Sequence, residues 1–143
     1  MKTVLVPIDG SDCTELAVTK AREMADFYHA KLIIMNIYDI PTLRSYFDFD
    51  TENREDNILQ DLRARSKKTL ETARGFIPDF SDDRIELVSL EGDPADRIVD
   101  YAKLNDVELI VMGSHGMGTF RRFFLGSVSH KVVVQAETPV MII

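Results

Sequence analysis

The chain contains very little cysteine and no long apolar run. Its 143 residues include one cysteine, Cys13, which excludes an internal disulfide. No stretch approaches the roughly 20 apolar residues that span a bilayer, and the apolar run near the N-terminus is too short for a signal peptide. Low-complexity tracts are also missing, so residues 1–143 are expected to fold as a single cytoplasmic domain with its own core.

Acidic residues are missing from one long part of an otherwise acidic chain. With 24 Asp and Glu against 17 Lys and Arg, the net charge of −7 argues against a nucleic-acid partner or an anionic membrane surface. Yet no acid lies in the 28 positions between Glu108 and Glu137, a region that contains Arg121, Arg122 and Lys131. A buried strand and an apolar helix would also exclude acids, so the gap leaves open whether this region holds a local anion site.

Short apolar runs recur along the chain and are separated by helical patterns. The runs are rich in branched residues and nearly continuous, which is typical of strands buried on both faces of a parallel sheet. They cover residues 2–8, 31–37, 84–90, 107–113 and 139–143. Their alternation with helical patterns predicts right-handed crossovers and an open α/β sheet.

Apolar residues at helical spacing predict a helix in each interval between strands. These helices are expected after residue 12, over about 59–76, from Pro94 and near 127–136. Asp12 with Glu15 resembles a capping box, while Asp93 is a favourable N-cap before a proline that suits the first helical position. Residues 39–57 show no sustained period and are expected to form an irregular loop that leads into a helix.

Two loops are expected to face one crevice. In open α/β sheets, ligands bind beyond the carboxyl ends of the strands, at the point where the strand order reverses. The first strand ends in PIDGSD (7–12), and the fourth ends in GSHGMGTFRRFFLGS (113–127). Asp9 can accept hydrogen bonds from a ribose or a base, whereas a glycine-rich loop exposes backbone N–H groups that suit phosphate oxygens. If the two strands are neighbours, their loops form complementary halves of one site.

The glycine loop does not match the common phosphate-binding motifs. Its first glycines have the span of a P-loop, but Thr119 and Phe120 stand where Lys and then Ser or Thr are required. A dinucleotide fingerprint would need a third glycine at the position of Arg121. The stretch DGSD lacks the second aspartate of a DxD phosphotransferase, so a phosphoaspartyl enzyme has weak support.

A different spacing does match. Gly113, Gly116, Gly126 and Ser127 fit the pattern G-2x-G-9x-G-[ST], which is that of the nucleotide-binding branch of the universal stress protein family. The segments VLVPIDGS, EGDPADRIVDYA, LIVMGSHGMG and LGSVSHKVVVQAETPVMII resemble family segments in the family's order. This resemblance covers the whole chain. It implies an open five-stranded parallel sheet in the order 3-2-1-4-5 with helices on both faces, the adenine nucleotide alpha hydrolase-like fold.

The resemblance also implies a ligand and the residues that hold it. The ligand would be ATP, with ADP or AMP as alternatives, and Mg²⁺ would be held mainly through the phosphates, without a metal site of the protein's own. The implied contacts are Pro7, Asp9, Ser11, Ile37, Met112, Gly113, His115, Gly116, Gly126, Ser127 and Val128. The resemblance further implies a homodimer through the strand 139–143, and we expect neither a nucleic-acid nor a membrane partner.

Several alternatives stay open at this stage. Asp9 alone would also fit a helix cap, Arg121 and Arg122 are either solvated or γ-phosphate contacts, and Cys13 is expected to be a small helix residue. The function is a stress-response or signalling module that binds ATP with at most slow hydrolysis or autophosphorylation, an interaction module with an empty or AMP-occupied site, or an efficient hydrolase or phosphotransferase. Efficient phosphoryl transfer needs metal-holding groups and a positioned base or arginine. Only one acid, Asp9, lies near, and no catalytic residue is identified, so the first function is favoured.

Overall fold

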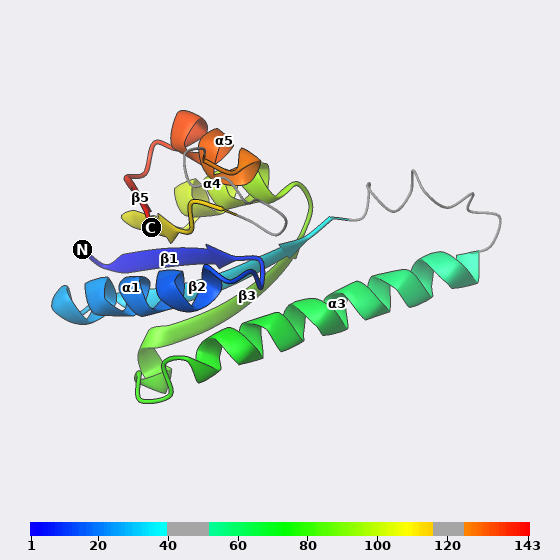
Figure 1. The fold of residues 1–143 in the computed structure, drawn as a ribbon, viewed down its shortest axis with the longest axis horizontal. Coiled ribbons are helices and arrows are strands. Elements are labelled where there is room, and N and C mark those ends of the chain that lie inside the picture. The colour runs from blue at the N-terminus through cyan, green and yellow to red at the C-terminus, as the bar shows by residue number, and fades with distance from the viewer. Residues whose placement is uncertain (40–51, 116–124) are drawn as a thin grey trace.

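Five parallel strands form one sheet (Figure 1). The computed structural model describes residues 1–39, 52–115 and 125–143, the side chains of residues 52–55 excepted. The sheet order is β3-β2-β1-β4-β5, as predicted. The strands are β1 (Thr3–Ile8), β2 (Lys31–Tyr38), β3 (Ile85–Glu91), β4 (Leu109–Met112) and β5 (Val140–Ile142). The predicted run at 107–113 is thus a shorter strand, whereas the bounds of the other four runs differ from those of the strands by no more than one residue at either end.

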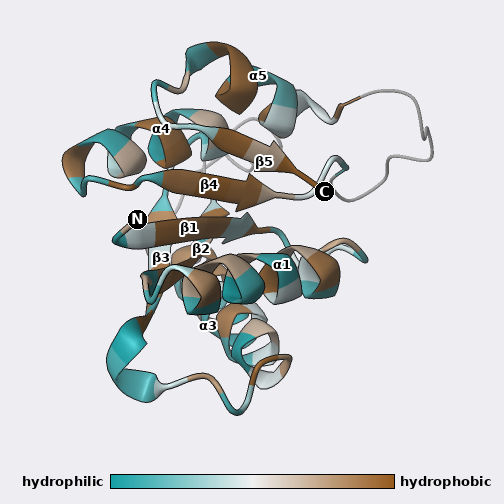
Figure 2. Cartoon of the chain, turned by 90° about the vertical axis from the view of Figure 1, so that its left-hand side faces the viewer, coloured by the Kyte–Doolittle hydropathy of each residue, from teal (hydrophilic) through white to brown (hydrophobic). Residues whose placement is uncertain are grey.

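Helices cover both faces of the sheet, two on each face (Figures 1 and 2). One face carries α1 (Thr14–Phe27) and α3 (Glu52–Gly75), and the other carries α4 (Pro94–Leu104) and α5 (Ser127–Gln135). A short 3-10 turn, Asp82–Arg84, leads into β3. The predicted α/β class is therefore confirmed. No helix in these described ranges is long and apolar enough to cross a membrane.

The central strands are buried on both sides, which explains their continuous apolar runs. Val4 and Val6 of β1 point into the core beneath α1 and α3, whereas Leu5 points into the core beneath α4 and α5. All three side chains are fully buried. Figure 2 shows β1, β4 and β5 as mostly hydrophobic, whereas the helices mix hydrophobic and hydrophilic residues. The sheet is therefore a rigid platform for the loops at its carboxyl edge.

The helix caps agree with the sequence in one case and differ in another. Asp93 accepts a hydrogen bond from the backbone N–H of Asp96 at 3.0 Å and so caps α4, as predicted. The capping box predicted at Asp12 is wrong, because α1 begins later and has Cys13 at its N-cap position without a side-chain cap. The turn after β1 closes with a hydrogen bond from the Thr14 N–H to the Ser11 carbonyl, 3.0 Å long. Asp12 lies inside this turn, before the helix begins.

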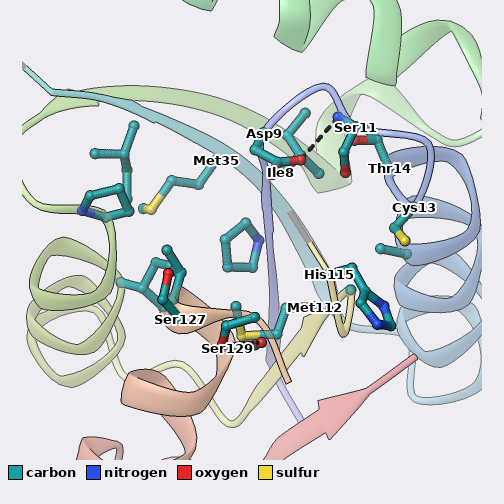
Figure 3. A pocket seen from close by; sticks show the side chains of 18 of the residues that line it. Ile8, Asp9, Ser11, Cys13, Thr14, Met35, Met112, His115, Ser127 and Ser129 are labelled. Atoms are coloured by element: carbon teal, nitrogen blue, oxygen red, sulfur yellow. Dashed lines mark hydrogen bonds between the residues drawn. The ribbon is translucent and has the colours of Figure 1, made fainter. Parts of the chain in front are cut away.

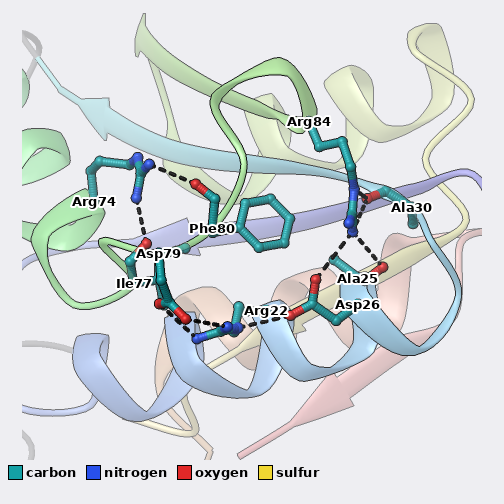
Figure 4. Close-up of polar contacts among 9 residues, drawn as sticks. All are labelled: Arg22, Ala25, Asp26, Ala30, Arg74, Ile77, Asp79, Phe80 and Arg84. Atoms are coloured by element: carbon teal, nitrogen blue, oxygen red, sulfur yellow. Dashed lines mark hydrogen bonds and ion pairs between the residues drawn. The ribbon is translucent and has the colours of Figure 1, made fainter.

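Arginine side chains fix the end of the sheet opposite the glycine loop (Figure 4). Arg84, just before β3, donates to the carbonyl oxygens of Ala25 and Ala30 at 2.9 and 3.1 Å. These carbonyls lie at and after the C-terminal end of α1, and that of Ala25 also accepts a hydrogen bond from the Ala30 N–H at 2.8 Å. Arg22 of α1 donates to both carboxylate oxygens of Asp79, at 3.1 and 2.8 Å. The segment between α3 and β3 is thereby tied to α1.

Candidate functional site

A cavity of about 460 Å³ opens at the carboxyl ends of β1 and β4, the neighbouring strands at which the order reverses (Figure 3). This is the place where open α/β sheets bind ligands. Ten of the eleven expected site residues line it: Pro7, Asp9, Ser11, Ile37, Met112, Gly113, His115, Gly126, Ser127 and Val128. The eleventh, Gly116, lies outside the described residues, as do Arg121 and Arg122. The structure thus brings the expected residues together, and their contact with a ligand stays a prediction.

One wall of the cavity is apolar. Met35 and Ile37 come from β2, while Pro94 and Ile98 come from the first turns of α4. Met35 and Ile98 are almost completely buried, so their side chains are held by the core and not only by the cavity surface. Val128 of α5 completes this wall. A flat, apolar ring system is the kind of group that such a wall can cover.

A tight turn holds Asp9 at the end of β1. Asp9 Oδ1 accepts a hydrogen bond from the Ser11 backbone N–H at 3.0 Å, drawn as a dashed line in Figure 3. The residue between them, Gly10, has a φ of 79°, a conformation that favours glycine. Behind the turn, the buried Asn36 side chain donates to the Ile8 carbonyl at 2.8 Å and fixes the end of β1. Asp9 does not cap α1, because Cys13 holds that position.

One carbonyl connects the two parts of the glycine motif that the structure describes, Gly113–Ser114 after β4 and Gly126 before α5. The Ser114 carbonyl oxygen accepts hydrogen bonds from the Gly126 N–H at 2.7 Å and from the Ser129 hydroxyl at 3.3 Å. The Ser114 N–H in turn donates to the Ile143 carbonyl at 3.0 Å, which ties this loop to the segment after β5. The start of α5 is therefore held beside the end of β4.

The start of α5 offers backbone donors to the cavity. Gly126 is its N-cap, no side chain caps the helix, and its first turn carries no acid. The first N–H groups of a helix lack intrahelical partners and, together with the helix dipole, favour an anion. The Ser127 side chain lines the cavity at the same end. Polar donors thus line one part of the cavity and apolar side chains another.

Comparison of the sequence with known families gives one match over the full length. The model of the Universal stress protein family matches residues 1–143. The chain belongs to the universal stress protein family. Universal stress protein YxiE of Bacillus subtilis is 33% identical over 144 residues, which cover 98% of this chain and 97% of the relative. A universal stress protein of Thermus aquaticus is 32% identical over 145 residues, which cover 99% of this chain and 98% of the relative.

Solved universal stress proteins share the fold along the whole chain. Universal stress protein UspA from Lactobacillus plantarum superposes with a TM-score of 0.85 at 27% identity and covers 99% of this chain and 97% of its own. A universal stress protein in complex with cAMP has a TM-score of 0.71 at 29% identity, and the match covers 99% of this chain and 95% of that protein. The universal stress protein from Archaeoglobus fulgidus in complex with dAMP has a TM-score of 0.68 at 25% identity, and the match covers 99% of this chain and 97% of that protein.

In this universal stress protein, the cavity also contains residues that sequence reasoning missed. These are Ile8, Cys13, Thr14, Ala17, Met35, Pro94, Ile98, Leu125 and Ser129. Cys13 was expected to be only a small helix residue, yet its free thiol lines the cavity at the start of α1. The signal available in the sequence was its position two residues after Ser11, on the same turn as Asp9.

Carboxylates and metal-binding groups are sparse at this site. Asp9 is the one carboxylate among the described residues that line the cavity. Across the described ranges, no group of three or more His, Cys, Asp or Glu side chains is placed to hold a metal ion. His115 lines the cavity, and its Nδ1 lies 2.6 Å from the Ser114 hydroxyl oxygen. The donors at the start of α5 therefore face a cavity with little opposing negative charge.

Proposed function

We propose that this universal stress protein is an ATP-binding stress-response or signalling module of the cytoplasm, and that the cavity between β1 and β4 is its nucleotide site. The observation that carries the proposal is the division of this one cavity into an apolar wall and a polar side with a helix N-terminus. A nucleotide has the same division between its base and its phosphates. Two similar proteins were solved with cAMP and with dAMP, which supports an adenine nucleotide here.

In this proposal the base lies against Ile37 and Val128, and Asp9 accepts a hydrogen bond at the nucleoside end. The phosphates lie near Gly113 and the first amides of α5, where the Ser127 hydroxyl adds a donor. The motif adds Gly116 to this side. A volume of about 460 Å³ falls within the roughly 300–1,000 Å³ usual for small-molecule sites. The cavity is thus large enough for a nucleotide without rearrangement of the sheet.

We expect slow turnover at most. Efficient phosphoryl transfer needs side chains that hold metal ions and a group that positions the nucleophile. Asp9 is the one carboxylate in the described lining, so Mg²⁺ would be carried mainly by the phosphates themselves. Hydrolysis should therefore be far below the roughly 1–1,000 turnovers per second of typical enzymes. The role assigned here is to hold the nucleotide.

We also propose a homodimer through β5. This strand is at the edge of the sheet and is only half-buried in the single chain, and exposed apolar edges favour pairing with another chain. Val133 and Val134, near the end of α5, are 44% and 69% exposed. Light scattering at micromolar concentration should give about twice the 16.2 kDa of one chain. A monomer that stays soluble and folded after removal of residues 139–143 would contradict this assembly.

Mass spectrometry of the nucleotide released from freshly purified protein tests the main proposal. We expect an adenine nucleotide in near-stoichiometric amount, and calorimetric titration of the emptied protein should show tighter binding of ATP than of adenosine. Rapid release of ADP from added ATP would favour the efficient hydrolase instead. Protein that carries no nucleotide and binds none would support an interaction module and overturn the proposal.

A further inference from the structure

Most of the buried polar side chains lie at the carboxyl edge of the sheet. Within the described part of the chain these side chains are Thr14, Asn36, Ser66 and Ser129. Thr14 and Ser129 line the proposed nucleotide cavity, and Asn36 donates to the carbonyl of Ile8, which lines it as well. A buried amide needs a hydrogen-bond partner, whereas an apolar side chain in its place would need none. The amide of Asn36, in an otherwise apolar part of β2, therefore indicates a role for its hydrogen bond.

Asn36 points away from the apolar wall of the cavity. Leu32 and Ile34 point into the core beneath α1 and α3, and Asn36 lies on the same face because side chains alternate along a strand. Met35 and Ile37, on the other face, line the cavity. Asn36 is not among the lining residues, and its side chain is only 8% exposed. Any effect of Asn36 on a bound nucleotide must therefore pass through another residue.

The hydrogen bond of Asn36 ends one residue before Asp9. Its Nδ2 lies 2.8 Å from the Ile8 carbonyl oxygen, and the two residues are partners in the register of β1 and β2. That oxygen belongs to the same planar peptide unit as the Asp9 nitrogen, so the bond restricts the direction in which the chain leaves β1. Asp9 itself is exposed, and the core does not hold its carboxylate in place. Its position therefore depends on the backbone that Asn36 holds.

The start of α1 holds the other side of the same turn. The Ser11 N–H donates to Asp9 Oδ1 at 3.0 Å, and the Ser11 carbonyl accepts from the Thr14 N–H at 3.0 Å. The turn thus has one anchor on β2 and one on α1. Without the anchor on β2, the peptide between Ile8 and Asp9 can rotate, and the carboxylate would move with it.

We propose that Asn36 is a positioning residue of the nucleotide site, which holds the peptide between Ile8 and Asp9 so that the Asp9 carboxylate faces the nucleoside. This inference rests on the proposed nucleotide function. Asn36→Leu removes the amide and keeps a side chain of similar size. It should weaken ATP and adenosine by the same factor, roughly threefold to tenfold, as expected for the loss of one hydrogen bond.

Calorimetric titration with both ligands measures this loss, and Ser66→Ala is the matched control. Ser66 is also buried, and its Oγ lies 2.6 Å from the Ser89 Oγ, a contact between α3 and β3 that does not line the cavity. Its loss should lower the stability to urea and leave both affinities within about twofold. A loss of ATP affinity in Asn36→Leu no larger than that in Ser66→Ala would overturn the proposal.

A double-mutant cycle separates positioning from a general structural role. If Asn36 acts through Asp9, then adding Asn36→Leu to Asp9→Ala should change the ATP affinity by less than about twofold, because residues that share one function are not additive. If the two losses instead multiply in the double variant, Asn36 does not act through Asp9 and the proposal is wrong.

The NMR shift of the Ser11 amide proton reports on Asp9 without any nucleotide. In the native chain the bond to the carboxylate should move this signal downfield, and in Asn36→Leu it should move back toward its position in Asp9→Ala. Asn36→Val, which suits a strand, removes the same amide if Asn36→Leu does not fold. If the native chain binds no nucleotide, the nucleotide function fails, but the Ser11 signal still decides whether Asn36 positions Asp9: an unchanged signal rules it out.

Discussion

Cys13 lies where a side chain on Gly113 would lie. A Cβ built on Gly113 would come 2.9 Å from the Cβ of Cys13, closer than side-chain carbons approach. The first glycine of the motif is therefore required by the close approach of the β4 loop to the start of α1. The φ of Gly113 is outside the left-handed region that favours glycine. A side chain is therefore excluded at Gly113 by the steric clash with Cys13 and not by the backbone conformation.

Gly113→Ala should therefore disturb both the fold and the cavity. The new methyl group must push the start of α1 away from the β4 loop, and overpacking of this kind destabilises by roughly 1–3 kcal/mol. Urea unfolding measures the loss. Gly75→Ala is the control, because a Cβ there would meet nothing within 4 Å, and it should be neutral or slightly stabilising. A Gly113→Ala protein as stable as the Gly75→Ala protein would contradict the contact with Cys13.

Cys13 provides a test of the cavity that needs no mutation. It is the only cysteine of the chain, and its free thiol lines the cavity. ATP bound as proposed should cover it, so saturating ATP should slow its reaction with a thiol reagent at least tenfold. Mass spectrometry of the labelled protein gives both rates. Adenosine should protect less if the phosphates lie near Gly113, and equal labelling with and without ATP would place the nucleotide elsewhere.

The α/β class was predictable because it depends on local patterns, whereas the strand order 3-2-1-4-5 was implied by the resemblance to the universal stress protein family. The run at 31–37 is apolar at nearly every position, and β2 is in fact buried on both faces along most of its length. The loop after β4 carried glycine and serine at a recognisable spacing, and the family resemblance based on that spacing implied the expected site residues. What these patterns have in common is that each is a property of a short segment.

The features that the sequence did not predict depend on how segments distant in the sequence pack against one another. The capping box at Asp12 was wrong because the turn at Gly10 delays the start of α1, and that turn follows from a positive φ that the sequence does not reveal. Cys13 lines the cavity only because α1 begins beside the β4 loop. Arg65 and Lys68 share a groove with Thr14 although about fifty residues separate them. Such placements require the three-dimensional arrangement.

Asp93 makes the stability of α4 depend on pH. The backbone N–H of Asp96 lowers the pKa of Asp93 below its usual 3.8, and Lys131 lowers it further. Because the folded pKa is below the unfolded one, the stabilisation is present above the unfolded value and is lost as the pH falls through the folded value. Asp93→Asn should therefore lose less stability than the native protein between about pH 5 and about pH 2.

Urea unfolding at several pH values measures this difference. Asp100→Asn is the control, because Asp100 is an exposed carboxylate of the same helix that forms no ion pair with a described residue. That variant should follow the native pH dependence. If Asp93→Asn followed it too, the cap would make no contribution to acid unfolding.

Lys131 joins the two helices that form one side of the cavity. Its Nζ lies 2.9 Å from Asp96 Oδ1 and 3.4 Å from Asp93 Oδ1, so α5 is tied to the first turn of α4. Lys131→Met should weaken ATP binding roughly threefold to tenfold by loosening this wall, and should change stability by no more than about 1 kcal/mol, as for an exposed ion pair. Calorimetry gives the affinity.

The control for this change is Lys103→Met. Lys103 pairs with Glu137 at 3.2 Å, an ion pair between the last turn of α4 and the segment after α5 that does not line the cavity. It should leave the ATP affinity unchanged. Equal affinities for the two variants would show that the wall needs no ion pair to hold its position.

The roles of the two ends of the proposed nucleotide site can be tested separately by comparing the binding of ATP with that of adenosine. Asp9→Ala should weaken both ligands alike, because its proposed contact is with the nucleoside. Gly116→Val places a branched side chain where the motif brings the backbone close to phosphate. The loss of several contacts at roughly 1.5–3 kcal/mol each should weaken ATP at least a hundredfold, whereas adenosine binding should change little. Calorimetry with both ligands on both variants decides between these roles. If Gly116→Val lost affinity for ATP and adenosine equally, or kept its ATP affinity, the phosphates would not lie at the glycine loop.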